Sequence, residues 1–369
     1  MNHDPVQQRI QIPPDIVRPE IRSDTEGTAP FRAGMKYGRA LRDIEAGEYK
    51  IIQGSFATAL AFYSWLRKHT SHEYPVNDHS SSRLNRKKLA ERAGHIMIRV
   101  RDHKPDMDKA PSNPWLKDFY PDINEFLISL PDLLGMNGAR QWFMNGVKYP
   151  VLDHRLHPFY GAYFPVRTAH LMLLDNWMNR SMKLFRHVKD IGTGCGIMGF
   201  MALKHGAKSV HATDINPNAI FSTITDAGRM GLRSRLTAEQ ASFFGKKNRG
   251  LGKGPGLTLF NPPWIPGSSS NIIDKGIYYE EGFFEEFLAD AAENIDSGGI
   301  IAVVFSDYAI IAGLTGKNPV ETAVSASNHF SLADVITGKV PERSRKRSRS
   351  WINRIRENET TGLWILKRT

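Results

Sequence analysis

A glycine-rich loop between a short apolar strand and a helix places the strongest constraint on the fold of this chain. The loop runs from Asp190 to Gly196 (DIGTGCG), after a strand predicted at 186–190 and before a helix predicted at 196–205. Its glycines let the backbone turn sharply and approach a bound molecule closely. Further predicted strands and helices alternate after it, the strands at 208–213, 257–260, 299–306 and 361–367 and the helices at 218–230 and 282–294. The alternation predicts a Rossmann-like α/β sheet, parallel and covered by helices on both faces.

Length and composition predict more than one folded part. The chain has 369 residues, of which 41% are hydrophobic, and this is enough for one large or two ordinary domains. We expect residues 1–35, which are polar with scattered prolines, to form an extended arm. Residues 36–150 should form a mixed α+β auxiliary or substrate-recognition region, with a helix at 56–67 and a strand at 96–101. The α/β domain should then occupy residues 151–369.

The sequence also bears on location and on metal binding. No apolar run reaches the ~18 residues of a membrane span, and the start lacks the pattern of a signal peptide. Cys195 is the single cysteine, which excludes an intramolecular disulfide, and the 13 histidines show no metal-ligand spacing. We therefore expect a cytoplasmic protein without a metal and without a membrane partner.

Three polar residues end predicted strands, namely Asp190, Asp214 and Asn261. Ligands of such sheets bind outside the carboxyl ends of the strands. An acid at 190 favours S-adenosylmethionine (SAM), which carries an ammonium group, over a dinucleotide pyrophosphate, although the glycines also fit G-x-G-x-x-G. Asp214 can accept hydrogen bonds from both ribose hydroxyls, or it can cap the helix that follows. The predicted SAM-binding residues are Asp190, Gly192, Thr193, Gly194, Gly196, Asp214, Ser242 and Asn261.

The turn formed by Asn261, Pro262, Pro263 and Trp264 predicts a site for a target nitrogen. Its two prolines remove two backbone donors, so the Asn261 side-chain oxygen and the Pro262 carbonyl remain as acceptors. A planar –NH2 group that donates to both directs its lone pair toward the SAM methyl group, and Trp264 can stack on that plane. We therefore predict Asn261, Pro262 and Trp264 as catalytic residues. Without the glycine loop, an ordinary proline-rich turn with a buried tryptophan would be an equally good interpretation.

These motifs together resemble class I SAM-dependent methyltransferases of the small-domain type. Within this type, the chain is similar to the release-factor glutamine N5-methyltransferases and the N6-adenine methyltransferases. The resemblance covers residues from about 160 to 369 and rests on the glycine loop, Asp214 and residues 261–266 (NPPWIP). It implies that the first two residues of the Asn-Pro-Pro-Trp turn hold the target nitrogen.

Residues 164–168 (FPVRT) also resemble a family segment, which implies that Phe164 and Arg167 line the substrate site. The chain departs from the family pattern at Trp264, where Tyr or Phe is usual. Residues 1–150 show no resemblance to the N-terminal domain of the glutamine enzymes. The resemblance therefore covers the transfer of the methyl group better than it covers the choice of substrate.

A polar and aromatic segment at 274–281 follows the turn, after a flexible stretch at 267–270. We interpret this segment as a lid or substrate loop, with Asp274 and Tyr278 as candidate substrate contacts. The alternative is that Tyr278 or Tyr279 packs under the helix that follows.

Positive charge is concentrated near the carboxyl terminus. The formal net charge is +11, and residues 339–356 carry eight basic side chains against one acid. Such a run binds phosphates, serves as a targeting signal or forms a solvated loop. Nucleic acid is therefore a possible partner through this segment.

The leading hypothesis is a SAM-dependent methyltransferase that methylates a planar or primary nitrogen of a small molecule or a protein side chain. The alternative is a nucleic-acid methyltransferase that acts on adenine N6 and flips the base out of its stack. A SAM-binding regulator without activity has no need for a nitrogen clamp, and a nicotinamide-dependent oxidoreductase is disfavoured by Asp190. Both therefore rank lower.

Overall fold

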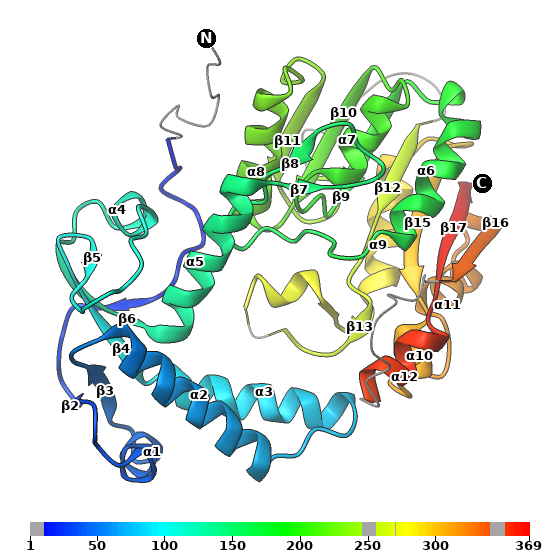
Figure 1. Cartoon of the computed structure of the whole chain (residues 1–369). Coiled ribbons are helices and arrows are strands. Elements are labelled where there is room, and N and C mark those ends of the chain that lie inside the picture. Colours follow the sequence, from blue (N-terminus) through cyan, green and yellow to red (C-terminus); the bar gives the residue numbers. More distant parts are fainter. Residues whose placement is uncertain (1–10, 246–255, 270, 340–350) are drawn as a thin grey trace. The chain divides into compact units, whose positions relative to one another are not determined.

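The computed structural model describes residues 11–245, 256–269, 271–339 and 351–369. These residues divide into two compact units, which we describe separately (Figure 1). The larger unit contains residues 15–17 and 142–369, and the smaller one contains residues 11–14 and 18–141. The division falls within helix α5 (Leu130–Asn145). Within the described residues, no helix combines the length and apolar character that a membrane crossing requires.

The smaller unit is built on a mixed sheet with the strand order β1-β6-β4-β3-β2. Strands β2, β3 and β4 are parallel, whereas β6 and β1 alternate in direction and β5 pairs with β4. Its strands are β1 (Ile21–Arg22), β2 (Thr28–Phe31), β3 (Tyr49–Ile52), β4 (Ile96–Arg101), β5 (Lys104–Pro105) and β6 (Glu125–Ser129), and its helices before α5 are α1 (Tyr37–Glu45), α2 (Phe56–Glu73), α3 (His79–Ala93) and α4 (Trp115–Phe119). The unit is α+β, as predicted.

Part of the expected amino-terminal arm belongs to this sheet. Strand β2 pairs with β3 in parallel, and Phe31 at its end is fully buried against Phe62 of α2. Burial of this aromatic ring and the long-range backbone pairing hold residues 28–31 in place. The prediction of an extended arm over residues 1–35 is therefore wrong for strands β1 and β2, which belong to the sheet.

The larger unit contains a seven-stranded sheet with the order β11-β10-β9-β12-β15-β17-β16. All strands are parallel except β17, which runs antiparallel to β15 and β16. The strands are β9 (His187–Ile191), β10 (Ser209–Asp214), β11 (Leu236–Gln240), β12 (Leu257–Phe260), β15 (Ile300–Ser306), β16 (Phe330–Lys339) and β17 (Thr360–Arg368). Numbered along the chain within this sheet, the order is 3-2-1-4-5-7-6.

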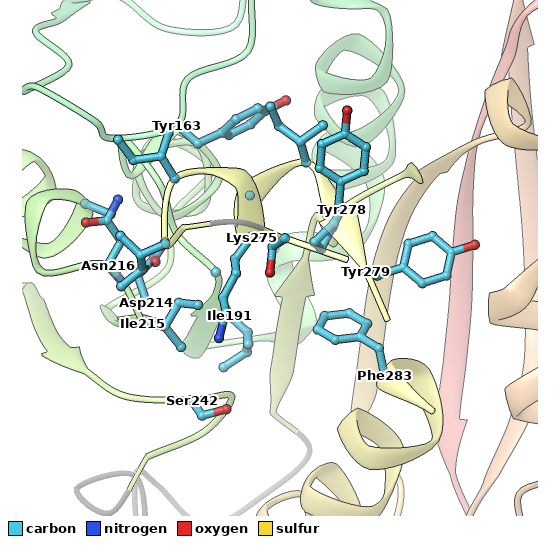
Figure 2. Close-up of a pocket in the computed structure, with 18 of the residues that line it drawn as sticks. Tyr163, Ile191, Asp214, Ile215, Asn216, Ser242, Lys275, Tyr278, Tyr279 and Phe283 are labelled. Carbon is cyan, nitrogen blue, oxygen red and sulfur yellow. Dashed lines mark hydrogen bonds between the residues drawn. The ribbon is translucent and has the colours of Figure 1, made fainter. Parts of the chain in front are cut away.

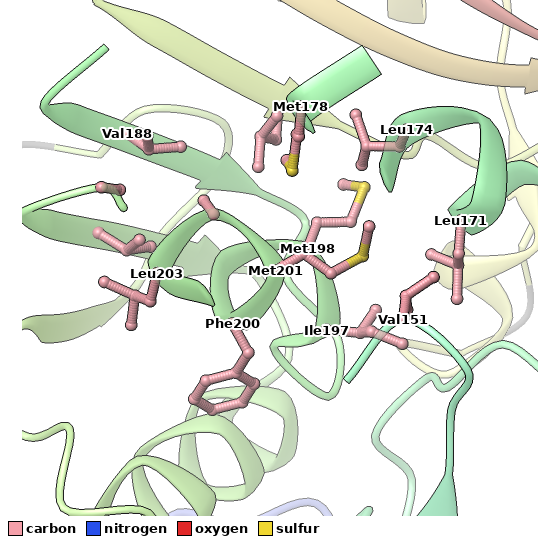
Figure 3. Packing of buried hydrophobic residues seen from close by; sticks show 14 of the residues in the cluster. Val151, Leu171, Leu174, Met178, Val188, Ile197, Met198, Phe200, Met201 and Leu203 are labelled. Carbon is pink, nitrogen blue, oxygen red and sulfur yellow. The ribbon is translucent and has the colours of Figure 1, made fainter. Parts of the chain in front are cut away.

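Helices cover both faces of this sheet because the strands are apolar on both sides. In β15, Ala302 and Val304 join one core, whereas Ile301 and Val303 join the other. The first core contains α6 and α7, whose side chains meet around Met198 (Figure 3). The second core contains α9 and α11. The helices are α6 (Ala169–Ser181), α7 (Ile197–Lys204), α8 (Pro217–Arg229), α9 (Phe283–Asn294), α10 (Tyr308–Ile311), α11 (Pro319–Ala326) and α12 (Trp351–Asn358), with short 3-10 turns at Met182–Leu184 and Asp274–Gly276.

The predicted Rossmann-like α/β sheet is confirmed, but its last strand, predicted as parallel, is antiparallel to both neighbours. Every strand and helix predicted within residues 186–306 is present, with bounds that differ by at most one residue. Two short strand pairs lie outside this sheet. Strand β7 (Val147–Lys148) pairs with β8 (Arg155–Leu156), and β13 (Ile265–Pro266) pairs with β14 (Tyr278–Tyr279). The basic run at 340–350 lies outside the described residues.

Candidate active site

A pocket of about 550 Å³ lies at the carboxyl ends of β9, β10 and β12 in the larger unit. Ile191, Asp214 and Asn261, at the end of these three strands or just beyond, all line it. Figure 2 shows Asp214 and its neighbours on one side of the pocket and Tyr278, Tyr279 and Phe283 on the other. The pocket is therefore where ligands of parallel α/β sheets bind.

The three loop glycines have different roles. All have positive φ, which favours glycine. At Gly192 an added Cβ would find its nearest neighbour 4.0 Å away, and this residue lines the pocket. At Gly194 a Cβ would lie 2.7 Å from the backbone oxygen of Tyr163, and at Gly196 it would lie 2.7 Å from the ring of Phe200. The missing Cβ at Gly192 thus leaves space for a ligand. At Gly194 and Gly196 it lets the Tyr163 backbone and the Phe200 ring pack closely against the loop.

This difference predicts unequal effects of alanine at 192 and 194. Both variants adopt a strained positive φ, at a cost of roughly 1–3 kcal/mol. Gly194→Ala must also displace the Tyr163 backbone, and overpacking of this kind costs about 1–3 kcal/mol more. Urea unfolding should therefore show a larger loss for Gly194→Ala than for Gly192→Ala. Equal losses would contradict the close approach to Tyr163.

Asp190 is buried beneath the loop and does not contact the pocket. Its Oδ2 accepts hydrogen bonds from the Thr193 hydroxyl at 2.6 Å and from the Gly199 N–H at 3.0 Å. The side chain is fully buried and does not line the pocket. In the structure Asp190 and Thr193 hold the loop to the start of α7, and the contact of Asp190 with SAM stays a prediction.

The titration of Asp190 predicts a pH dependence of stability. Burial raises its pKa to about 7, while the hydrogen bonds from Thr193 and Gly199 act in the opposite direction. Unfolded Asp titrates near pH ~3.9, so between about pH 4 and 7 the folded state holds a proton that the unfolded state has released. The contribution of Asp190 to the free energy of unfolding therefore falls as the pH rises from about 4 to 7. Asp190→Asn should therefore lose less stability than the wild type between pH 5 and pH 8 in urea titrations; parallel losses would contradict this.

Asp214 lines the pocket and is fixed by two backbone donors. Its Oδ2 accepts from Gly194 N–H and its Oδ1 from Asn216 N–H, both at 2.9 Å. The alternative helix-capping role belongs to Asn216, whose side chain accepts from the Asn218 N–H at the start of α8. Each carboxylate oxygen keeps a further lone pair, so Asp214 is suited to a ribose diol.

Asn261 lines the pocket, and its amide is held by Trp264. The Trp264 indole N–H donates to its Oδ1 at 3.0 Å. Pro262 is buried, whereas Pro263 lines the pocket. Trp264 packs against the core and meets His170 edge-on at 5.2 Å, outside the pocket lining. The expected stacking of Trp264 on the substrate is therefore replaced by contact with Asn261.

This contact predicts a specific effect of Trp264→Phe. Phenylalanine retains most of the packing but removes the donor to Asn261, and one hydrogen bond contributes about 1 kcal/mol. We expect kcat to fall roughly five- to tenfold while the dissociation constant of SAM stays unchanged. Initial rates at saturating SAM would measure this. A rise in KM with unchanged kcat would instead support a tryptophan that binds the substrate.

The remaining predicted residues separate into two groups. Phe164, Ser242 and Tyr278 line the pocket. Arg167 pairs with buried Glu359 at 2.5 Å, and Asp274 lies on the loop above the pocket without lining it. The pairing of Arg167 leaves its charge engaged within the protein.

Both interpretations of the tyrosine pair have a counterpart in the structure. Tyr278 lines the pocket. Tyr279 is buried and meets the ring of Phe284 on α9 edge-on at 5.1 Å. Tyr279 also lines the pocket, so the two interpretations are compatible.

Several lining residues were not predicted from the sequence. Tyr163, Asn216, Phe243 and Lys275 all line the pocket. Phe243 has a positive φ of 43°, and its carbonyl accepts a hydrogen bond from the Thr213 hydroxyl at 2.5 Å. Strained backbone of this kind is concentrated at binding sites.

The pocket has no metal-binding character in the part of the chain that is described. No group of three or more His, Cys, Asp or Glu side chains is arranged there to hold an ion.

The sheet order, the glycine loop and the acid at the end of the second strand define a class I SAM-dependent methyltransferase, and this chain is one. Its residues fit SAM: Gly192 leaves open space and Asp214 offers two carboxylate oxygens beside it.

Comparison with known proteins agrees with this class. The family model "Ribosomal protein L11 methyltransferase (PrmA)" matches residues 167–247. A "Putative protein N5-glutamine methyltransferase" of Methanocaldococcus jannaschii is 27% identical over 161 residues, which cover 41% of this chain and 75% of that protein. The ribosomal protein L11 methyltransferase of Acinetobacter baumannii is 40% identical over 68 residues, which cover 18% of this chain and only 23% of that protein.

Solved structures of methyltransferases are also similar. The ribosomal protein L11 methylase of Lactobacillus delbrueckii subsp. bulgaricus has 20% identity and a TM-score of 0.36, with 60% of this chain and 91% of that chain covered. The N-methyltransferase NodS of Bradyrhizobium japonicum, in complex with S-adenosyl-L-homocysteine, has 12% identity and a TM-score of 0.35, with 54% and 85% covered.

Proposed function

We propose that this enzyme transfers a methyl group from SAM to a planar or primary nitrogen of a protein side chain or a small molecule. The observation that supports this most is the Asn261 side chain, which lines the pocket near Asp214 while its amide is oriented by Trp264. A hydrogen-bond acceptor at this position suits a substrate that brings N–H donors.

The proposed mechanism relies on positioning. Asn261 Oδ1 accepts one hydrogen bond from Trp264 and keeps a second lone pair. This lone pair and the Pro262 carbonyl would accept both hydrogens of a planar –NH2 group. SAM supplies an electrophilic methyl group when bound. Holding the nitrogen in line with that methyl group converts a bimolecular encounter into an oriented one, which can supply much of the rate.

The proposed cofactor contacts follow from the pocket walls. Asp214 would accept hydrogen bonds from the ribose hydroxyls, and Gly192 would lie against the methionine part. Ser242 and Phe243 line the pocket beyond the end of β11, where they would contact the adenine. Tyr163, Phe164 and Tyr278 would enclose the target group.

Transfer of labelled methyl from SAM into a cell extract tests this proposal, with the extract separated by size after the reaction. Label in protein or in the small-molecule fraction, lost with Asn261→Ala, supports it. Label that nuclease releases would favour the alternative, methylation of adenine in nucleic acid. No enzyme-dependent transfer into any fraction, with SAM bound, would contradict it.

A further inference from the structure

A stack of aromatic rings runs from the core of the smaller unit to its surface. The buried rings of Phe31 and Phe62 lie 4.6 Å apart at an angle of 15°. Tyr37 of α1 lies 5.3 Å from Phe62, and Trp65 of α2 lies 5.4 Å from Tyr37. His69, one helical turn further along α2, stacks on Trp65 at 4.8 Å and 12°. His69 is exposed, so the stack ends at the surface.

Exposed cationic residues lie close to the outer rings in the sequence. Lys36 and Arg39 lie on either side of Tyr37 in the sequence. Lys68 precedes His69 and lies three positions after Trp65, a spacing that brings side chains together on a helix. None of the three cations forms a salt bridge in the described part of the chain.

The acids of the neighbouring elements are already engaged by two buried cations. Lys50 Nζ binds the carboxylates of Asp43 at 2.7 Å and Glu48 at 2.5 Å. Arg92 Nη2 binds those of Glu45 at 2.6 Å and Glu73 at 2.8 Å. The two cations offset half of the charge of these four carboxylates. The rest is outweighed by the five other cations at the start of α1 and on α1 and α2, namely Lys36, Arg39, Arg42, Arg67 and Lys68, so the net charge of these elements is positive.

We propose that this ring-stack surface, formed by Lys36, Tyr37, Trp65, Lys68 and His69, binds single-stranded nucleic acid. An unpaired base would extend the stack on His69, and the cations would bind the adjacent phosphates. Every base has a flat face, so such a surface tolerates different sequences, whereas its phosphate contacts make binding salt-dependent. The proposal depends on the smaller unit alone and is independent of the methylated atom.

The test uses the full-length protein and a fluorescein-labelled oligouridylate of about 16 nucleotides, the upper site size of a small single-strand binding fold. Fluorescence anisotropy would give its affinity at several salt concentrations. We expect His69→Ala to weaken binding about tenfold, the effect of losing one stacked base. Lys68→Glu should weaken binding and flatten the salt dependence by at least about 0.7 in log–log slope, the effect of one phosphate contact.

Lys117→Glu is the matched control, because Lys117 is an exposed lysine on α4 and the substitution changes the net charge equally. It should leave the affinity within about twofold of the wild type. Three results would overturn the proposal: equal weakening by Lys117→Glu, equal affinity for a blunt duplex, or displacement of the RNA by polyglutamate as effectively as by unlabelled RNA. Because Lys68, His69 and Lys117 are exposed, thermal melting should show that all three variants are folded.

Discussion

Replacement of Asn261 by alanine is expected to lower kcat by at least about 100-fold, because misplacement of a reacting group by about 1 Å has an effect of this size. Asn261 lines the pocket, and its amide is oriented by the Trp264 indole. Alanine removes the acceptor that would orient the target nitrogen. Rates of methyl transfer at saturating SAM would measure the effect.

The control for this variant is Asn176→Ala, which makes the same chemical change on the exposed side of α6. It should retain full activity. SAM affinity should fall only a few-fold in Asn261→Ala, so that the loss appears in kcat. Full activity of Asn261→Ala would contradict the assigned role, and a loss explained wholly by weaker SAM binding would make Asn261 a cofactor residue instead.

Asp214→Ala is expected to weaken SAM binding by about 100-fold or more. The carboxylate anchors Gly194 and Asn216 and would also bind the ribose hydroxyls. Hydrogen bonds to a charged group each contribute about 1.5–3 kcal/mol, and two of them exceed a hundredfold in affinity. Isothermal titration calorimetry with SAM would measure the change.

The control for Asp214→Ala is Asp334→Ala, which removes an exposed carboxylate on strand β16. It should bind SAM like the wild type. Burial raises the pKa of Asp214, while the N–H donors of Asn216 and Gly194 lower it, so protonation should weaken SAM binding at a higher pH than for an exposed aspartate. Undiminished SAM affinity in Asp214→Ala would contradict the cofactor assignment.

Local sequence signals were sufficient for the sheet of the larger unit. Strands such as 300–306 are apolar on both faces, and the loop glycines require positive φ, so each signal lies within a few residues. The short strand Thr28–Phe31 was missed, because its pairing with residues 49–52 depends on contacts distant in the sequence.

The site was predictable in position more than in detail. Ends of parallel strands converge, so Asp214 and Asn261 could be placed at one edge of the sheet. The inward direction of Asp190 and the hydrogen bond between Trp264 and Asn261 depend on side-chain geometry that spacing does not specify. Tyr163 reaches the pocket from a separate segment and carries no motif of its own.

The most direct test of the central claim is to identify the atom that receives the methyl group. SAM labelled with ¹³C in its methyl group would be incubated with the enzyme and a cell extract, and the labelled product would be examined by NMR. We expect an enzyme-dependent resonance of a methyl group bonded to nitrogen, which Asn261→Ala removes. A methyl group bonded to oxygen, carbon or sulfur would contradict it.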